Sequence, residues 1–584
     1  MENVEIAAIL DEISTLLEIK GANPFRIRAY ENAARTVETH TTPMRKLVAE
    51  GTDLTELPAI GKDLARHIAE LVTTGRLAML DQLTDEIPRS LVELVRLPGV
   101  GAKRVRVLWE ALGITTIDAL EQAARSGAIA ELRGFGAKSQ DKILRAIEGY
   151  RRRGARIPLG DVDELVQPLL EYLAGCEEAL CVEVAGSYRR RVETVGDVDV
   201  LVAATDGQSV IEHFTRYPNV RAVERAGGTR ATVRLGGGLQ VDLRAVPPES
   251  YGAALQYFTG SKAHNVKLRT WAVARGLRIS EYGVFKVDPA QAQDDDPYAG
   301  ECVAGRDERE VYEALGMPYI VPELREDRGE LEAAREDALP SLITLADMRG
   351  DLQMHSTWSD GTASIEAMAR ACGAKGYEYF AITDHSKALA MTGGLDAARM
   401  RQQWVEIEEV QARHPEIRIL RSVEVDILAD GSLDLEDEML EALDLVVASV
   451  HSRLDLPSAE QTARITRALE HSRVDVLAHP TGRLLNRRDP MVFDVDTVLE
   501  AAAERGVAVE LNAHPDRLDL RDTHLMRAKE LGVKVVISTD AHRVRDLDLM
   551  HYGIEQARRA WLSPSDVLNT QPLDELLAAT RRLG

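Results

Sequence analysis

The sequence has few cysteines and no long apolar run. Cysteine occurs four times in 584 residues, at Cys176, Cys181, Cys302 and Cys372, so we expect buried thiols in a reducing cytosol rather than disulfides or a zinc site. No window approaches roughly 18 uncharged apolar residues, so no membrane span is predicted. The N-terminal "MENVEIAAILDEISTLLEI" has acidic residues where a signal peptide has basic ones. We therefore expect a cytoplasmic protein without a membrane partner.

The negative charge is unevenly distributed along the chain. The net charge is −24, and residues 336–584, with 28 basic and 43 acidic side chains, supply −15 of it. Ten of the fourteen histidines lie in the same part. Clustered histidines and carboxylates indicate a metal centre there, while an overall negative charge does not exclude a basic groove elsewhere. We predict two halves with different functions.

A short motif recurs three times near the N-terminus. It reads "LPAIGKDLARHI" at 57–68, "LPGVGAKRVRVL" at 97–108 and "LRGFGAKSQDKIL" at 132–144, each a glycine turn before an amphipathic helix with basic residues. Such turns direct backbone N–H groups and a helix N-terminus toward a phosphate. One copy would fit ordinary helix packing equally well, but three copies favour contact with the DNA backbone. The pattern resembles the helix-hairpin-helix motif, and the predicted DNA-binding residues are Gly61, Gly99, Gly101, Lys103, Gly134 and Gly136.

Two aspartates occur one residue apart within a strand-like run, "GSYRRRVETVGDVDVLVA" at 186–203. Residues i and i+2 of a strand point to the same face, so Asp197 and Asp199 project side by side and repel each other. A second strand, "LQVDLRAV", supplies Asp242. A lone Asp-x-Asp pair would more often be a solvated strand edge, but three converging carboxylates suit two Mg²⁺ ions bridged to substrate phosphates. We predict phosphoryl transfer with these three aspartates as catalytic residues.

From residue 350 onward, strand-like runs alternate with helical stretches, which predicts an α/β barrel with parallel strands. Nearly every run ends in His, Asp or Glu, where barrel active sites lie. Imidazole and carboxylate together suit Mn²⁺, Zn²⁺ or Fe²⁺. One such histidine alone would more often be structural, but the whole series predicts a metal-dependent phosphoesterase. The predicted ligands are His355, Asp360, His385, Glu424, His451, His479, Asp540 and His542.

Two longer motifs make the sequence recognisable. "GSYRRRVETVGDVDVL" resembles the catalytic motif of the nucleotidyltransferase superfamily, and "YFTGSKAHNVKLRTWAVARGLRISEYGVF" at 257–285 resembles the nucleotide-binding segment of family X DNA polymerases. Nearly the whole chain resembles a bacterial family X DNA polymerase with a C-terminal PHP (polymerase and histidinol phosphatase) domain. The implied fold is multidomain, with an all-α helix-hairpin-helix region, an α+β palm with an α-rich nucleotide-binding subdomain, and an α/β PHP barrel.

The resemblance also implies domain boundaries. They are 1–80 for an N-terminal helical domain with the first helix-hairpin-helix, 81–150 for a helical DNA-binding domain with two more, 151–250 for the palm, 251–325 for the nucleotide-binding subdomain, 326–345 for a linker and 346–584 for the PHP domain.

The same resemblance assigns roles around the aspartates. They would be the ligands of Mg²⁺ or Mn²⁺, with Asp242 nearest the primer hydroxyl. Tyr257 and Phe258 would face the sugar, Asn265 the minor-groove edge of the incoming base and Arg269 the template strand. The remaining nucleotide-binding residues would be Ser187, Arg190 and Gly196 at the triphosphate, and Gly260. Lys262 stands where some members have an acid, so stacking beside the base is expected to differ.

The implied activity is DNA-directed filling of short gaps in DNA repair, by a monomer that uses gapped or primer-template DNA and deoxynucleoside triphosphates. A tailing nucleotidyltransferase is the alternative within this chemistry. The PHP domain would be a 3′-5′ exonuclease. Its first motif usually reads His-x-His, whereas Gln353 stands here before His355. A glutamine carbonyl is a weaker ligand, so an inactive scaffold and a phosphatase of small phosphomonoesters remain alternatives.

Some relatives also remove a sugar phosphate through a lysine that forms a Schiff base. At the corresponding place this chain has His67, preceded by Arg66, and neither side chain forms an imine. Lys62 is expected to sit in the preceding turn rather than on the helix face. We predict weak or absent lyase activity.

Overall fold

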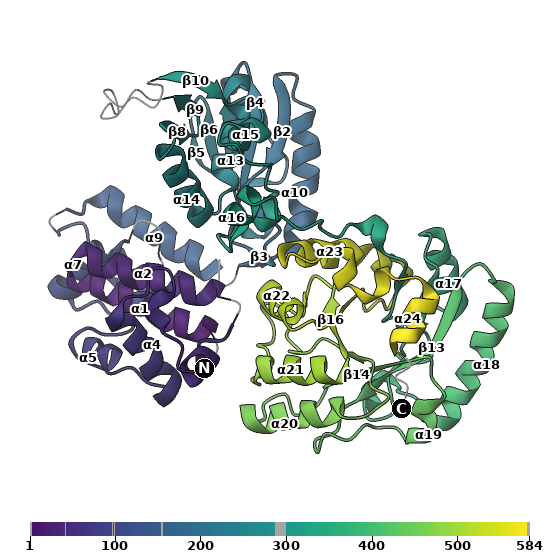
Figure 1. Ribbon diagram of the computed structural model, residues 1–584. Helices are drawn as coiled ribbons and strands as arrows, with labels where there is room; N and C mark the ends of the chain where they lie inside the picture. The colour runs from purple at the N-terminus through teal and green to yellow at the C-terminus, as the bar shows by residue number, and fades with distance from the viewer. Residues whose placement is uncertain are drawn as a thin grey trace. The chain divides into compact units, whose positions relative to one another are not determined.

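Figure 1 shows a computed structural model of the protein. It describes residues 3–40, 42–95, 97, 100–132, 134–152, 156–286 and 300–580. The chain forms two compact units, Met1–Ala155 and Arg156–Gly584. Across the described ranges, no helix combines the length and the apolar character needed to cross a membrane.

The first unit consists of helices and connecting turns in the part that the structure describes, without a strand. Its helices share one apolar core, to which α1 contributes Leu10 and α7 contributes Val105. The glycine turns of the repeated motif each precede a helix, with Gly61 before α4, Gly101 before α7 and Gly136 before α9. The helices are α1 (Asn3–Lys20), α2 (Pro24–Thr39), α3 (Met44–Ala49), α4 (Lys62–Thr74), α5 (Ala78–Glu86), α6 (Leu91–Val95), α7 (Ala102–Leu112), α8 (Ile117–Arg125) and α9 (Ala137–Arg152).

The second unit begins with the palm, here residues 156–250, which contains a five-stranded sheet. The strand order is β2-β4-β7-β6-β5, with β4 and β7 parallel and the other neighbours antiparallel. Because side chains alternate along β4, Val200 and Val202 enter the core with α10, whereas Asp199 and Leu201 lie on the other face, where Leu201 packs with Ala254 of α13. The elements are β1 (Ile157–Pro158), α10 (Leu159–Ala174), β2 (Ala179–Val184), α11 (Gly186–Arg189), β3 (Thr194–Val195), β4 (Asp197–Ala204), α12 (Gly207–Thr215), β5 (Val220–Ala226), β6 (Arg230–Leu235) and β7 (Gln240–Val246).

A helical subdomain, residues 251–335, follows the palm. Its antiparallel sheet has the order β10-β9-β8. The segment 326–345, predicted to be a linker, instead packs into this subdomain at its start, because Glu330 of α16 is buried with Oε1 2.7 Å from Nδ1 of His264. The elements are α13 (Tyr251–Thr259), α14 (Lys262–Val273), β8 (Leu277–Ser280), β9 (Gly283–Lys286), β10 (Glu301–Ala304), α15 (Glu308–Glu313) and α16 (Glu330–Arg335).

The C-terminal part is a parallel barrel, residues 350–580. Seven strands pair in sequence order from β11 to β17. A parallel bridge from Met354 to Ala541, with the N–H of His355 donating to the Ala541 carbonyl at 2.8 Å, links the two ends of the sheet. Helices α17, α18, α20, α21 and α22 lie outside the strands (Figure 1), so the strands are apolar on both faces. The predicted fold classes of all three regions are confirmed.

The bounds of the barrel elements complete the description. They are β11 (Gly350–Asp351), α17 (Ile365–Ala374), β12 (Tyr379–Ile382), α18 (Ala397–Arg413), β13 (Arg418–Asp426), α19 (Asp437–Glu441), β14 (Leu445–Ser449), α20 (Ser458–Leu469), β15 (Val476–Leu477), α21 (Val495–Arg505), β16 (Ala508–Asn512), α22 (Asp522–Glu530), β17 (Val535–Ser538), α23 (Met550–Arg559) and α24 (Leu573–Thr580).

The four cysteines are free thiols, but they are not all buried. Cys372 is buried on α17, as predicted. Cys181 and Cys302 are exposed and Cys176 is half-buried, so the prediction is wrong for these three. Cys181 lies on β2 and Cys302 on β10, each at the edge of its sheet, where one side of the strand faces solvent.

Candidate active sites

Three carboxylates meet on the parallel strand pair at the centre of the palm sheet. Asp199 of β4 is directly opposite Asp242 of β7, and Asp197 lies two residues before Asp199 on the same face. Asp242 accepts hydrogen bonds from Thr232 Oγ1 at 2.5 Å and from Gln240 Nε2 at 2.7 Å. The structure therefore brings together the three aspartates that the sequence singled out, on a rigid part of the sheet.

The three aspartates repel one another, which favours a bound cation. Burial, and then the charges of Asp197 and Asp242, raise the pKa of Asp199 to about 7, although Arg244 and Arg190 oppose the shift. A divalent ion between the carboxylates would relieve this repulsion. Three carboxylate groups are the hard oxygen donors that Mg²⁺ and Mn²⁺ prefer, so the residues present fit a two-metal site.

The turn before α11 fits against the acidic strand. Gly186 has φ +63°, and a Cβ atom there would lie 2.6 Å from Oδ2 of Asp199. The backbone N–H of Ala185 donates to the Asp199 carbonyl at 2.8 Å. Ser187 follows in the first turn of α11. Only glycine allows the turn to approach the carboxylates this closely, which places the hydroxyl of Ser187 on an element that borders the acidic site.

Arg190 follows α11 directly and is held from two sides. Its Nε donates to Glu326 Oε1 at 3.0 Å, and its Nη1 donates to the Thr259 carbonyl at 2.6 Å. A Cβ atom on Gly260 would lie 3.2 Å from the same Nη1. The predicted triphosphate residue Arg190 and the predicted nucleotide residue Gly260 are thus neighbours. Gly196 is exposed and directly precedes β4.

The predicted sugar and base residues lie on α13 and α14. The rings of Tyr257 and Phe258 meet edge to face, with centroids 5.1 Å apart. Asn265 Nδ2 donates to the Tyr257 carbonyl at 2.7 Å, and Arg269 Nε donates to the Asn265 carbonyl at 3.2 Å. Ser261 caps α14, so Asn265 is not the helix cap that an ordinary structural role would give it.

Sequence reasoning missed Arg244 in this region. Its guanidinium carbon lies 4.3 Å from the ring centroid of Phe258, and its charge lowers the pKa of Asp199. Arg244 is two residues after Asp242 on β7, so the alternation of the strand already placed it on the acidic face.

Glu424, near the end of β13, is the centre of a second site in the barrel. Its carboxylate is completely buried and faces four imidazoles. The distances from its oxygens are 2.9 Å to His479 Nε2, 3.2 Å to His451 Nε2, 3.3 Å to His385 Nδ1 and 3.4 Å to His355 Nε2. One carboxylate shared by four histidines is an arrangement typical of a multinuclear metal centre.

Two further aspartates complete the barrel site. Asp540 Oδ1 lies 3.1 Å from His355 Nε2, and Asp360 Oδ2 lies 3.5 Å from His542 Nε2. Within each of three overlapping groups, one ligand atom from every residue lies within 4.8 Å of the others. The groups are His355, Asp360, His385 and His542; His385, Glu424 and His451; and His355, Glu424 and Asp540. All eight predicted ligand residues therefore converge at one mouth of the barrel.

The charges in the barrel site are strongly coupled. Burial would raise the pKa of Glu424, but His385 and His451 lower it well below its usual value. Burial would lower the pKa of His451, but Glu424 and Asp426 raise it to about 10. Imidazole and carboxylate donors that pair this tightly with each other can exchange the shared protons for divalent ions. The residues present therefore fit the metals that the sequence implied.

Gln353 lies in the same mouth with its polar atoms unused. The residue is 1% exposed, and within the described chain neither its Nε2 nor its Oε1 has a hydrogen-bond partner. A buried amide without partners is costly, and an ion is one way to satisfy its carbonyl oxygen. Gln353 therefore offers a neutral amide oxygen where the motif usually has an imidazole nitrogen.

Residues that support the ligands were not predicted. Asn512 Nδ2 donates to Asp540 Oδ2 at 3.1 Å, and Arg517 Nε lies 3.5 Å from the same oxygen. Asp384 precedes His385 and accepts from the backbone N–H of Ser356 at 2.8 Å. These residues follow strands in the same way as the ligands, so their positions at strand ends were the available signal.

The glycine turns of the first unit expose helix N-termini. Gly61 is the N-cap of α4 and Gly101 that of α7, and a glycine offers no side-chain acceptor to the first N–H groups. A Cβ at Gly61, Gly101, Gly134 or Gly136 would meet nothing within 4 Å, and Lys103 is exposed on α7. These N–H groups are therefore open to a phosphate. Gly99 lies outside the described residues.

A cavity of about 750 Å³ lies beside α4 and is lined by His67, which stands at the position expected to correspond to the Schiff-base lysine. His67 is 8% exposed, and its Nδ1 lies 2.9 Å from the Tyr30 hydroxyl. Lys62 lines the same cavity as the first residue of α4, not in the preceding turn as predicted, because the helix begins directly after Gly61.

Comparisons with known proteins agree with this geometry. Five family models match the chain: a helix-hairpin-helix domain at 1–77, a SAM-like helix-hairpin-helix tandem at 91–148, DNA polymerase beta palm at 156–226, DNA polymerase beta thumb at 254–326 and a PHP domain at 351–514. The "DNA polymerase/3'-5' exonuclease PolX" of Bacillus subtilis (strain 168) is 40% identical over 584 residues, which cover 100% of both chains. The chain belongs to the PolX family of DNA polymerases. The predicted resemblance is thus confirmed.

More distant relatives match about half of the chain. DNA polymerase lambda of Rattus norvegicus is 25% identical over 343 residues, 56% of each chain. DNA polymerase lambda of Arabidopsis thaliana is 26% identical over 320 residues, 51% of this chain and 57% of the relative. As a PolX polymerase with palm and PHP domains, the protein is a metal-dependent nucleotidyltransferase that binds DNA.

The close approach of Gly186 to Asp199 gives a direct test in this PolX chain. We expect Gly186→Ala to reduce nucleotide addition by orders of magnitude, because the new methyl group would displace the Asp199 carboxylate and strain the positive φ. Gly316→Ala is the matched control, since Gly316 has φ +70° but open space around its Cβ position. Equal loss of primer extension in both variants would contradict the steric argument.

Proposed function

We propose that the protein fills short gaps in DNA during repair, by two-metal nucleotidyl transfer at Asp197, Asp199 and Asp242. The observation that carries this proposal is the register of β4 and β7, which sets Asp199 opposite Asp242 beneath the Gly186 turn. Bound Mg²⁺ or Mn²⁺ would activate the primer 3′-hydroxyl and stabilise charge on the phosphates. A tailing enzyme would not need to bind a second DNA end. The repeated glycine turns could bind the DNA on both sides of a gap, so they favour the gap-filling role.

The protein's own residues orient the reactants. Asp242, fixed by Thr232 and Gln240, would face the primer terminus, while Ser187, Arg190 and Gly196 would bind the triphosphate. Tyr257 and Phe258 would pack against the sugar, with Gly260 beside them. Asn265 would reach the base, and Arg269 the template strand. The hydrogen bonds that hold Arg190, Asn265 and Arg269 support these roles.

The glycine turns would hold the DNA that flanks the gap. The exposed N-termini of α4, α7 and α9 offer backbone N–H groups to phosphates without reading bases, and Lys103 adds positive charge. Binding of this kind is independent of sequence, as gap repair requires, and weakens as salt rises.

We further propose that the PHP barrel degrades DNA 3′ ends, with Mn²⁺, Zn²⁺ or Fe²⁺ in the cluster around Glu424. The convergence of the eight predicted ligand residues supports this assignment, as does the name of the Bacillus subtilis relative, a DNA polymerase/3'-5' exonuclease. An inactive scaffold would not need to keep Glu424 and four imidazoles within 3.4 Å in a buried site. A phosphatase of small phosphomonoesters is an outcome that the nuclease assay distinguishes.

The two activities are separable by mutation. We expect Asp197→Ala to abolish primer extension on gapped DNA but to preserve Mn²⁺-supported 3′-5′ degradation, because the two metal sites use different residues. His355→Ala and His451→Ala should have the opposite effect. His471→Ala is the matched control, since this histidine lies on the barrel surface and pairs with Asp437. Degradation that survives both His355→Ala and His451→Ala would contradict the PHP assignment.

The ligand position of Gln353 is also testable. We expect Gln353→His to increase the Mn²⁺ retained after dialysis and to lower the Mn²⁺ concentration for half-maximal degradation, because imidazole binds this metal more strongly than an amide carbonyl. Gln402→His, at an exposed position of α18, is the control for an added imidazole. Unchanged metal content and unchanged Mn²⁺ dependence would show that Gln353 is not a ligand.

The lyase reaction should be weak or absent. His67 replaces the amine that would form the Schiff base, and its pKa is lowered by burial and by Arg66, so it is neutral at pH 7. Borohydride trapping on an incised abasic site should therefore give little cross-link. Lys62 is the one lysine among the described residues that line the cavity, so Lys62→Ala is the control for any residual signal. A strong cross-link at a lysine of residues 1–90 would overturn this prediction.

A further inference from the structure

Three consecutive arginines, Arg189 to Arg191, lie at and after the end of α11. Each forms an ion pair with an acidic residue of a different segment. Arg189 Nη1 lies 2.8 Å from Glu308 of α15, and Arg190 Nε lies 3.0 Å from Glu326. Arg191 Nη2 lies 2.9 Å from Asp163 of α10. The turn that carries Ser187 is therefore fixed by ion pairs to the palm and to the helical subdomain.

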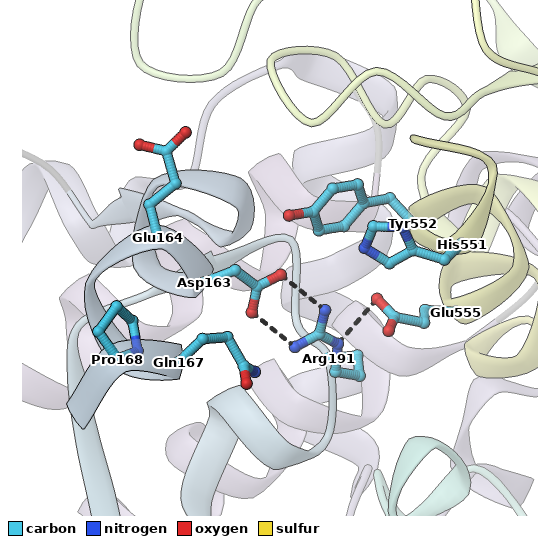
Figure 2. Close-up of a pocket in the computed structure, with 8 residues that line it drawn as sticks. All are labelled: Asp163, Glu164, Gln167, Pro168, Arg191, His551, Tyr552 and Glu555. Atoms are coloured by element: carbon cyan, nitrogen blue, oxygen red, sulfur yellow. Dashed lines mark hydrogen bonds and ion pairs between the residues drawn. The ribbon is translucent and has the colours of Figure 1, made fainter. Parts of the chain in front are cut away.

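The barrel takes part in the same network through α23. Figure 2 shows Arg191 between Asp163 of the palm and Glu555 of α23, where Arg191 Nε lies 2.7 Å from Glu555 Oε2. The side-chain amide of Gln556 donates to the Arg191 carbonyl at 2.7 Å. Arg559 Nη1 donates to the Arg190 carbonyl at 2.7 Å. Two side chains of one PHP helix thus hold the backbone of the triphosphate motif.

Arg559 also reaches the partner of the Arg190 side chain. Its Nη1 lies 2.9 Å from Glu326 Oε1, the same oxygen that accepts from Arg190 Nε. Its Nη2 lies 2.8 Å from Asp522 Oδ2 of α22. Arg559 is 4% exposed and Asp522 is 7% exposed. Buried charges of this kind are tolerated only when every member is paired, so the network specifies one arrangement of these side chains.

The contacts leave one nitrogen of Arg190 for a substrate. Nε and Nη1 are engaged by Glu326 and by the Thr259 carbonyl, whereas Nη2 has no hydrogen bond among the residues that the structure describes. The backbone N–H of Arg190 donates to the Gly186 carbonyl at 3.3 Å, and a Cβ atom on Gly186 would lie 2.6 Å from Asp199 Oδ2, so Arg190 belongs to the turn that borders the acidic site. A guanidinium fixed at two nitrogens presents the third in one direction, which suits binding of a phosphate oxygen.

We propose that Arg559 of the PHP barrel and Glu326 are positioning residues for Arg190, so that the barrel completes the nucleotide site of the polymerase. The proposal rests on the proposed role of Arg190 in triphosphate binding. Arg559 acts on both parts of Arg190, by donating to its carbonyl and by orienting Glu326. Docking of the barrel thereby lowers the cost of ordering Arg190 when a nucleotide binds.

Two conservative variants of the full chain distinguish a positioning role of Glu326 and Arg559 from a purely electrostatic effect of these residues on Arg190. Glu326→Gln makes the surroundings of Arg190 more positive, so an electrostatic role alone would lower the KM for the nucleotide. Arg559→Lys keeps its charge, so an electrostatic role alone would leave the KM unchanged. Positioning requires both variants to raise the KM on gapped DNA about tenfold, which corresponds to ~1.4 kcal/mol, with a smaller change in kcat. An unchanged or lower KM in both variants would overturn the proposal.

Matched controls use a second ion pair on the same helix. Arg558 Nε lies 2.7 Å from Glu323 Oε1, a PHP contact that does not involve Arg190. Arg558→Lys and Glu323→Gln should leave the KM unchanged, and an equal rise in these variants would show a general docking effect and refute the specific one. 3′-5′ degradation and the melting temperature report folding of each variant.

Arg190→Ala distinguishes this inference from the function on which it rests. A KM raised by Arg190→Ala but not by Glu326→Gln or Arg559→Lys would leave triphosphate binding in place and reject the positioning role. A KM unchanged by Arg190→Ala would instead reject the proposed role of Arg190. In the double variant Arg190→Ala/Glu326→Gln, the effect should match that of Arg190→Ala alone, because residues that act through one another are not additive.

Discussion

Titratable side chains held close together on neighbouring strands are the constraint on which this molecule depends. In the palm, Asp197, Asp199 and Asp242 converge from two strands, and burial with mutual repulsion raises the pKa of Asp199 to about 7. In the barrel, Glu424 is buried among imidazoles. Divalent cations would relieve the repulsion among the three aspartates and would replace the protons that Glu424 and the imidazoles share, and the rest of the structure holds these groups in place.

Parallel strands provide that support in both halves. Neighbouring parallel strands run in the same direction, so residues far apart in the sequence become direct neighbours, as Asp199 and Asp242 do near the starts of β4 and β7. The barrel extends the principle to seven strands, with its ligands at or just beyond the strand ends. Both sites therefore depend on parallel strands. The palm carboxylates lie near the starts of β4 and β7 and were recognised from alternation along a strand, whereas the barrel groups were recognised from the ends of predicted strands.

Local periodicity made much of the fold and site predictable. Alternation along a strand placed Asp197 beside Asp199, and the run of strand-end ligands indicated the barrel site before any contact was known. Contacts that depend on packing were not predictable. Glu330 was read as part of a charged linker because its partner, His264, is 66 residues away and the pair is visible only once α14 and α16 pack together. The exposure of Cys181 likewise follows from the edge position of β2, which depends on strand order.

The arginines after Gly186 show why sequence motifs underdetermine a site. In the sequence, the positive charges of Arg189, Arg190 and Arg191 are equally suited to binding a triphosphate. In the structure each of them forms an ion pair with an acidic side chain. Arg190 and Arg559, which is 369 residues later in the chain, both contact Glu326. A guanidinium among acids in a buried network is less free to neutralise a ligand but better oriented toward one. The palm and the PHP barrel are therefore linked by charges at the nucleotide motif itself.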